Sequence, residues 1–344
     1  MKTTRDLSVD VTRGVAVLLM IVSHSIFFRY GLNNSVLTTL LLFGNLYCYT
    51  TFLLTFGIGS YFWRYSSWGR TGILLATYYA AGLASIWAYG QLSQWRYLLV
   101  WQYYPPFTEY LPSFALFTFL ITVFRSLITR LSGWMIMTAS LGLLIIGHLV
   151  TINSPLLRPL FGTPLTFDFP VLQYSFVVAL GICLARMIAS KHDTKEYLLL
   201  ATAYIFFVLD TLLSFSFRFT HAFDISIPWF NTEIRWPPSL LFIVRGLKWS
   251  LFTLVATRMA MRAHPLVKSL LMPLIYIGQR ALGYLVYHLL VLFAMKGLAL
   301  PMFGEIWELS IFVLALLLSY SILERCLSML YLRLGFSLAP SVRR

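Results

Sequence analysis

Charge is scarce in this sequence. Only 11% of its 344 residues are charged, whereas a soluble globular domain carries about 25%. Hydrophobic residues make up 59% of the chain and its mean hydropathy is +0.78. Because so little polar surface is available, lipid must be the solvent for much of the chain. No polar segment is long enough to fold as an appended soluble domain, so we predict one membrane domain over residues 1–344.

Cysteine and recognisable catalytic motifs are also scarce. Cys48, Cys183 and Cys326 fall within or at the edges of apolar segments and have no C-x-x-C spacing. This pattern favours buried thiols over a metal site or disulfides. No P-loop, G-x-G-x-x-G, H-E-x-x-H or G-x-S-x-G signature occurs. We therefore expect no metal, haem or flavin.

Long apolar runs, in contrast, are abundant. A spanning helix needs about 20 predominantly apolar residues. Ten segments meet this requirement, near residues 11–29, 36–62, 71–90, 109–128, 132–153, 170–189, 196–217, 239–261, 278–299 and 306–331. The first contains Arg13 and His24 and has no small-residue cleavage site, so we interpret it as an uncleaved span. The predicted fold is an all-α, polytopic integral membrane protein with about ten transmembrane helices.

The basic residues predict the orientation of these spans. The net charge is +14, but Lys and Arg are scattered one or two per loop, which argues for topology and against nucleic-acid binding. With ten spans, sixteen of the 26 Lys and Arg residues lie on the face that carries both termini, six lie on the other, and four lie within or at the edges of spans. Cytoplasmic loops are the basic ones. We therefore predict a multi-pass cell-membrane protein with cytoplasmic N- and C-termini.

Two predicted outer loops are rich in aromatic residues. They cover residues 91–107, with Trp95 and Trp101, and residues 218–238, with Trp229 and Trp236. Aromatic residues at this depth usually anchor the chain at the membrane interface. The alternative is that they stack on the sugar rings of an outer substrate.

Ionisable residues within a bilayer are costly, so each one is a candidate for function. Arg13 and His24 are eleven residues apart in the first span, which is close to three helical turns and places both on one face, about 16 Å apart along the axis. Asp10 precedes Arg13 by three residues and can pair with it. The structural alternative makes Arg13 a positive-inside anchor and His24 a polar contact between helices.

Two other regions carry such residues. Arg280 lies near the start of the ninth span, and His288 follows about two turns later. A helix-packing hydrogen bond is the structural alternative for His288. Asp210 lies in the outward half of the seventh span, and Arg245 and Lys248 enter the eighth from outside. These three residues predict either an ion pair that neutralises Asp210 or part of a site for an outer substrate.

The first span also resembles a known group of enzymes. Residues 8–24 read SVDVTRGVAVLLMIVSH, which is similar to the opening helix of the transmembrane acyltransferase superfamily. The spacing of Arg and His, with ten residues between them, resembles acyltransferase family 3. The surrounding sequence resembles the heparan-α-glucosaminide N-acetyltransferase-like family. Residues 52–57, 167–182 and 278–288 resemble further segments of these families more weakly.

The resemblance implies helices around a tunnel and transfer of an acyl group, acetyl above all, from cytoplasmic acyl-CoA. The acceptor would be a hydroxyl or amine of an extracytoplasmic glycan or glycolipid. Arg13 and Arg280 would hold the CoA phosphates. His24 would act as general base or acyl carrier, and His288 would position it or the thioester.

Asp210 and Arg245 would then lie toward the acceptor. A different class of function, a proton-coupled transporter or flippase, would use His24, His288 and Asp210 as a proton relay. A structural or assembly subunit would tolerate substitution of His24 and Arg13. The sequence leaves open the acceptor, the acyl chain length and the oligomeric state, a homodimer included.

Overall fold

The computed structural model describes residues 6–29, 35–63, 67–101, 106–150, 157–161, 169–190, 194–222, 238–300 and 305–333. Throughout these ranges the regular structure is helical, with no β-strand. Helices suit a chain in lipid, because each backbone N–H and C=O finds its partner within the same segment where no water is present. The predicted all-α fold class is confirmed for the described residues.

Seven helices in the described part of the chain are long and apolar enough to cross a membrane: α1 (Leu7–Arg29), α2 (Ser35–Tyr61), α3 (Trp68–Ala88), α9 (Val171–Ala189), α10 (Lys195–Ala222), α11 (Leu240–Ala263) and α15 (Ile306–Arg333). An eighth candidate is the pair α13 (Met272–Gln279) and α14 (Ala281–Gly297), which bends by 79° at Arg280. The protein is thus a multi-pass membrane protein by the length and composition of its helices.

Two of the ten predicted spans correspond to shorter apolar helices, α5 (Tyr110–Val123) and α7 (Gly133–Leu149). Their 14 and 17 residues rise about 21 and 26 Å, less than the roughly 30 Å of a bilayer's hydrocarbon core. The predicted segment 109–128 is divided because its helix breaks at Phe124, before α6 (Arg125–Arg130). The count of ten spans therefore stays a prediction.

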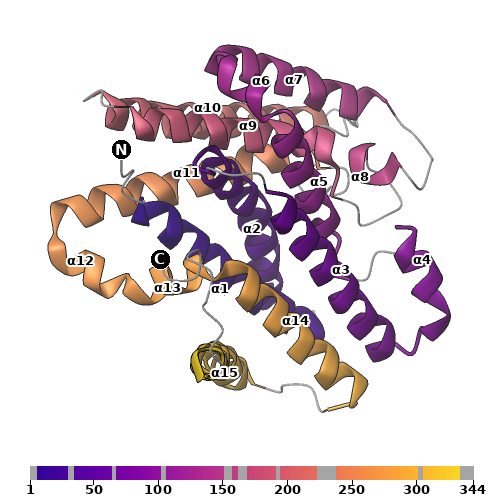
Figure 1. Ribbon diagram of the computed structural model, residues 1–344. Coiled ribbons are helices and arrows are strands. Elements are labelled where there is room, and N and C mark those ends of the chain that lie inside the picture. The colour runs from indigo at the N-terminus through magenta and orange to yellow at the C-terminus, as the bar shows by residue number, and fades with distance from the viewer. Residues whose placement is uncertain are drawn as a thin grey trace.

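The helices α1 and α2 lie side by side at the centre of the molecule (Figure 1). Around them pack α9, α11, α13 and α14, whereas α10 and α15 lie at the periphery with mostly exposed apolar surfaces. Glycines allow the closest crossings. Gly57 of α2 meets Gly181 of α9, and Gly14 of α1 meets α13 near Gly278, in each case without room for an added Cβ.

Short helices complete the described chain: η1 (Leu92–Gln94), α4 (Trp95–Leu99), α8 (Arg158–Phe161) and α12 (Pro265–Leu270). The first two occupy part of the predicted aromatic loop 91–107. Residues 223–237 of the second aromatic loop lie outside the described residues, as do Phe167 and Asp168 of the segment that resembles the acyltransferases.

Candidate functional site

The structure brings together His24 of α1 and His288 of α14. Nδ1 of His24 lies 2.9 Å from Nε2 of His288, although the two residues are 264 positions apart. Their ring centroids are 5.1 Å apart and the rings are nearly parallel, with an interplanar angle of 25°. Both side chains are buried, at 5% and 0% exposure. The two imidazoles therefore form a direct, water-shielded contact between the first helix and the bent pair.

Hydrogen bonding determines which ring nitrogen of each histidine carries the proton. Nδ1 of His288 lies 3.0 Å from the carbonyl oxygen of Tyr284. A carbonyl only accepts, so this nitrogen carries the proton of neutral His288, and its Nε2 accepts from Nδ1–H of His24. Nε2 of neutral His24 then keeps its lone pair, and no described residue donates a hydrogen bond to it. A base nitrogen held by an orienting partner is the arrangement that general-base and nucleophilic catalysis require.

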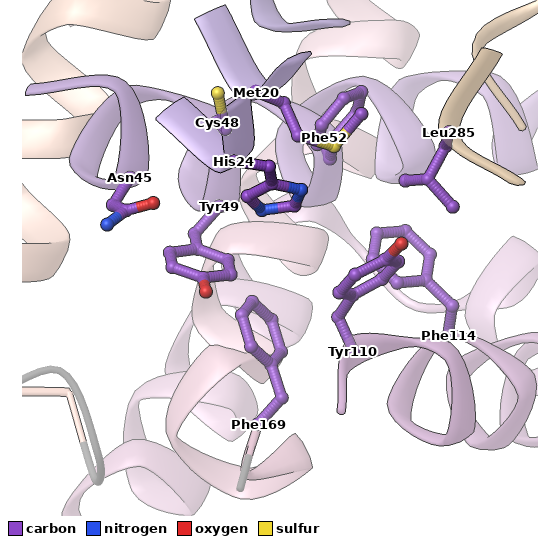
Figure 2. Close-up of a pocket in the computed structure, with 10 residues that line it drawn as sticks. All are labelled: Met20, His24, Asn45, Cys48, Tyr49, Phe52, Tyr110, Phe114, Phe169 and Leu285. Carbon is purple, nitrogen blue, oxygen red and sulfur yellow. The ribbon is translucent and has the colours of Figure 1, made fainter. Parts of the chain in front are cut away.

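A pocket adjoins His24 (Figure 2). Residues of α1, α2, α5, α14 and the segment before α9 line it: Met20, His24, Asn45, Cys48, Tyr49, Phe52, Tyr110, Phe114, Phe169 and Leu285. Most of this lining is aromatic or aliphatic, with a few polar groups among the rings. The cavity volume is about 20 Å³, which is room for about one water molecule.

The wall of the pocket is fixed by contacts between α5 and α9. Ser113 of α5 donates its hydroxyl to the carbonyl oxygen of Phe169 at 2.5 Å. The Phe169 ring stacks on Tyr174 of α9, with centroids 4.3 Å apart, and meets Tyr49 of α2 at 4.9 Å. These contacts hold Phe169 against α2, α5 and α9. Sequence reasoning did not predict this wall: Tyr110 lies at the end of a predicted span, and Phe169 entered only through the weak resemblance of residues 167–182.

Arg13 lies at the other end of the same helix face. Its Nη2 donates to the carbonyl oxygen of Thr55 at 3.1 Å, and Nη1 lies 3.8 Å from Oδ1 of Asp10. Asp10, at 2% exposure, also accepts from Nε2 of Gln279 at 3.3 Å. Arg13 and the end of α13 are thus linked through one carboxylate. The Arg13 side chain remains 22% exposed.

Arg280 occupies the bend between α13 and α14. Its Nε lies 2.5 Å from both carboxylate oxygens of Glu324 in α15, and its guanidinium stacks 3.8 Å from the ring centroid of Tyr276. The charge of Arg280 is therefore largely matched by Glu324. A phosphate bound at Arg280 would compete with the Glu324 carboxylate. The ion pair of Arg13 is longer: Nη1 lies 3.8 Å from Asp10, and Asp10 also accepts from Gln279 at 3.3 Å.

The structure places Asp210 and Arg245 together but away from the His24 pocket. Oδ1 of Asp210 accepts from Nε of Arg245 at 3.0 Å, and Oδ2 lies 2.5 Å from Nζ of Lys248. Arg245 also donates to Ser214 at 2.7 Å. The cluster joins α10 to α11, and none of its members lines the pocket. Two cations around one buried carboxylate form an ion-pair network that ties these helices together.

Within the described residues, no group of three or more His, Cys, Asp or Glu side chains is arranged to hold a metal ion. The cysteines are free and differ in exposure: Cys48 is buried, Cys183 is half-buried, and Cys326 is exposed on α15. No family model, curated protein or solved structure matches the chain.

Proposed function

We propose that this protein is a membrane-embedded acyltransferase. It moves an acyl group, acetyl above all, from cytoplasmic acyl-CoA to a hydroxyl or amine of an extracytoplasmic glycan or glycolipid. The observation that carries the proposal is the 2.9 Å contact between His24 and His288, which leaves a base nitrogen beside an aromatic pocket. The ten-span arrangement around a tunnel and the cytoplasmic termini belong to the same proposal.

His24 acts as the general base. Its Nε2 takes the proton of the acceptor O–H or N–H while the acceptor atom attacks the thioester carbonyl carbon. The C–S bond then breaks, sulfur takes the electron pair, and the proton passes from His24 to the CoA thiolate. His288 holds His24 in the required tautomer through the Tyr284 carbonyl. General-base catalysis of this kind contributes about 10²–10⁴-fold to a rate.

Arg13 binds the phosphates of CoA. It lies about 16 Å from His24 along α1, so the pantetheine arm spans the distance from the phosphates to the base. A guanidinium matches phosphate oxygens in a bidentate manner. The 22% exposure of the Arg13 side chain supports access by such a ligand.

A proton-coupled transporter or flippase is the alternative, with His24, His288 and Asp210 as the relay. One observation weighs against it: the carboxylate of Asp210 is engaged by Arg245 and Lys248 and does not line the His24 pocket. A relay through these three residues would therefore be interrupted.

The deciding experiment measures CoA release and acyl transfer. Purified protein is reconstituted with lipid extract from host membranes, which supplies the acceptor, and receives acetyl-CoA labelled in the acetyl group. An acyltransferase releases free CoA and labels an acceptor in equal amounts. A transporter turns over no acetyl-CoA, so the absence of both signals in folded protein would overturn the proposal.

A further inference from the structure

One buried hydroxyl in the His24 pocket has no partner. The phenolic oxygen of Tyr110 is buried and makes no hydrogen bond to any of the described residues, and the side chain is only 9% exposed. Burying a hydroxyl without a partner is costly, and most buried polar groups in proteins are satisfied. An exception inside a candidate active site is explained if a ligand supplies the missing acceptor.

The surroundings of Tyr110 fix its position. It is the first residue of α5, and the same helix is tied to Phe169 through Ser113. Figure 2 shows the Tyr110 ring rising from α5 across the pocket from Tyr49, with its hydroxyl directed toward the side where Leu285 lies. The hydroxyl is therefore held on a rigid helix at the wall of the same pocket as His24.

Acyl transfer needs a hydrogen-bond donor at this place. As the thioester carbonyl is attacked, its oxygen becomes negatively charged and must be stabilised by a donor aimed at it. Nε2 of His24 cannot donate while it acts as the base. No Lys or Arg lines the pocket, and the other neutral donors in its lining are the Asn45 amide and the Tyr49 hydroxyl. The Tyr110 hydroxyl is a buried donor that has no hydrogen-bond partner among the described residues.

We infer that Tyr110 is a second catalytic residue, which donates its phenolic hydrogen bond to the carbonyl oxygen of the acyl thioester; this rests on the proposed acyl transfer. The acceptor oxygen or nitrogen forms the bond to the carbonyl carbon, and the carbonyl π electrons move to the oxygen that Tyr110 holds. When these electrons return, the C–S bond breaks. The proton taken by His24 goes to sulfur, and Tyr110 keeps its own proton throughout.

Other unpartnered hydroxyls do not share this position. Ser23 and Ser25 flank His24 on α1 and also lack partners among the described residues, but neither lines the pocket. Tyr110 alone among these three combines an unused donor with a place in the pocket wall.

The test compares Tyr110→Phe with Tyr47→Phe, a matched loss of a hydroxyl from a buried tyrosine of α2 that does not line the pocket. Removal of one such donor lowers kcat by about 10²–10³-fold. We expect this loss for Tyr110→Phe, with acetyl-CoA binding within about twofold of the wild type and with no fall in melting temperature, because the free protein loses only an unsatisfied group. Tyr47→Phe should keep its transfer rate.

Two results would overturn the inference. One is wild-type kcat in Tyr110→Phe while His24→Ala is inactive, which leaves the proposed function standing. The other is a fall in melting temperature that matches the loss of activity, which makes Tyr110 a structural residue. If the wild-type protein itself releases no CoA from acetyl-CoA, the proposed function fails, and the role of Tyr110 fails with it.

Discussion

Single residues carry the chemistry of this proposal, and His24 carries most of it. His24→Ala removes the base, so acyl transfer should fall at least a hundredfold, while acetyl-CoA still binds. The control is His264→Asn. It replaces an exposed histidine at the N-cap of α12 with asparagine, a preferred N-cap residue. Transfer of label into host membranes measures both. Near-wild-type transfer by His24→Ala would contradict the mechanism.

The role of His288 can be separated in the same assay. A glutamine at position 288 offers a carbonyl oxygen close to the place of Nε2 and can accept from Nδ1–H of His24. His288→Gln should therefore retain more activity than His288→Ala. Equal losses in the two variants would mean that His288 does more than orient its partner.

Arg13 is expected to contribute binding rather than rate. Arg13→Ala removes a charge-assisted contact worth about 1.5–3 kcal/mol, so acetyl-CoA affinity should fall roughly ten- to a hundredfold. Arg13→Lys should recover only part, because lysine lacks the bidentate fork. Arg13 also bonds to Thr55, so Thr55→Val serves as the control. This variant removes the 3.4 Å contact between Nε of Arg13 and the Thr55 hydroxyl and keeps the charge of Arg13. Unchanged binding by folded Arg13→Ala would remove it from the site.

At the scale of the residue, the helical period explains how much of the site the sequence predicts. The eleven-residue spacing of Arg13 and His24 places both on one face because a helix turns every 3.6 residues. The contact of His24 with His288 depends on the register between α1 and α14, and no local pattern encodes that register. Tyr110 was missed for the same reason: its importance comes from a missing partner, which only packing reveals.

At the scale of the helix, hydropathy predicted where the chain is helical better than how the helices end. Each of the ten predicted segments coincides with a helix or helix pair. Residues 265–277 lie between two predicted spans, and the structure has α12 and most of α13 there. Pro273, Gly278 and Arg280 interrupt the apolar run there, and a window of about 20 residues averages such a short helix with its polar neighbours.

The crossing of α1 and α13 offers a test at this scale. A Cβ at Gly278 would meet the backbone of Asp10 and Gly14, so Gly278→Ala forces the helices apart. Overpacking of this kind costs about 1–3 kcal/mol, and the melting temperature in detergent should fall. Gly142→Ala is the control, because nothing lies within 4 Å of that position and alanine gains about 0.5–1 kcal/mol in a helix. Equal melting temperatures for the two variants would contradict the close crossing.

For the whole molecule, the open question is whether α5 and α7 cross the membrane. The N-terminus is predicted to be cytoplasmic. With that orientation, if both cross, the protein has ten spans and the segment between them, which contains Ser132, faces the cytoplasm. If neither crosses, it has eight spans and Ser132 faces outside. In both cases Ser93 lies outside and Ser269 lies inside, because the difference of two spans cancels before α9. Ser132 therefore distinguishes the two topologies.

Burial decides which positions can report on this question. Thr108 and Ser67 are buried at 0% and 4% exposure, so a cysteine at either position would be shielded from reagent. Ser93, Ser132 and Ser269 are exposed. Single cysteines at these three positions, in a background without the native cysteines, should give one label from outside, at Ser93, when cells receive an impermeant thiol reagent. Labels at Ser132 and Ser269 should appear only after permeabilisation. Outside labelling at Ser132 with a protected Ser269 would establish eight spans. The physical reason would be the length of α5: its 14 residues rise only about 21 Å, so it would lie within the bundle without crossing the membrane.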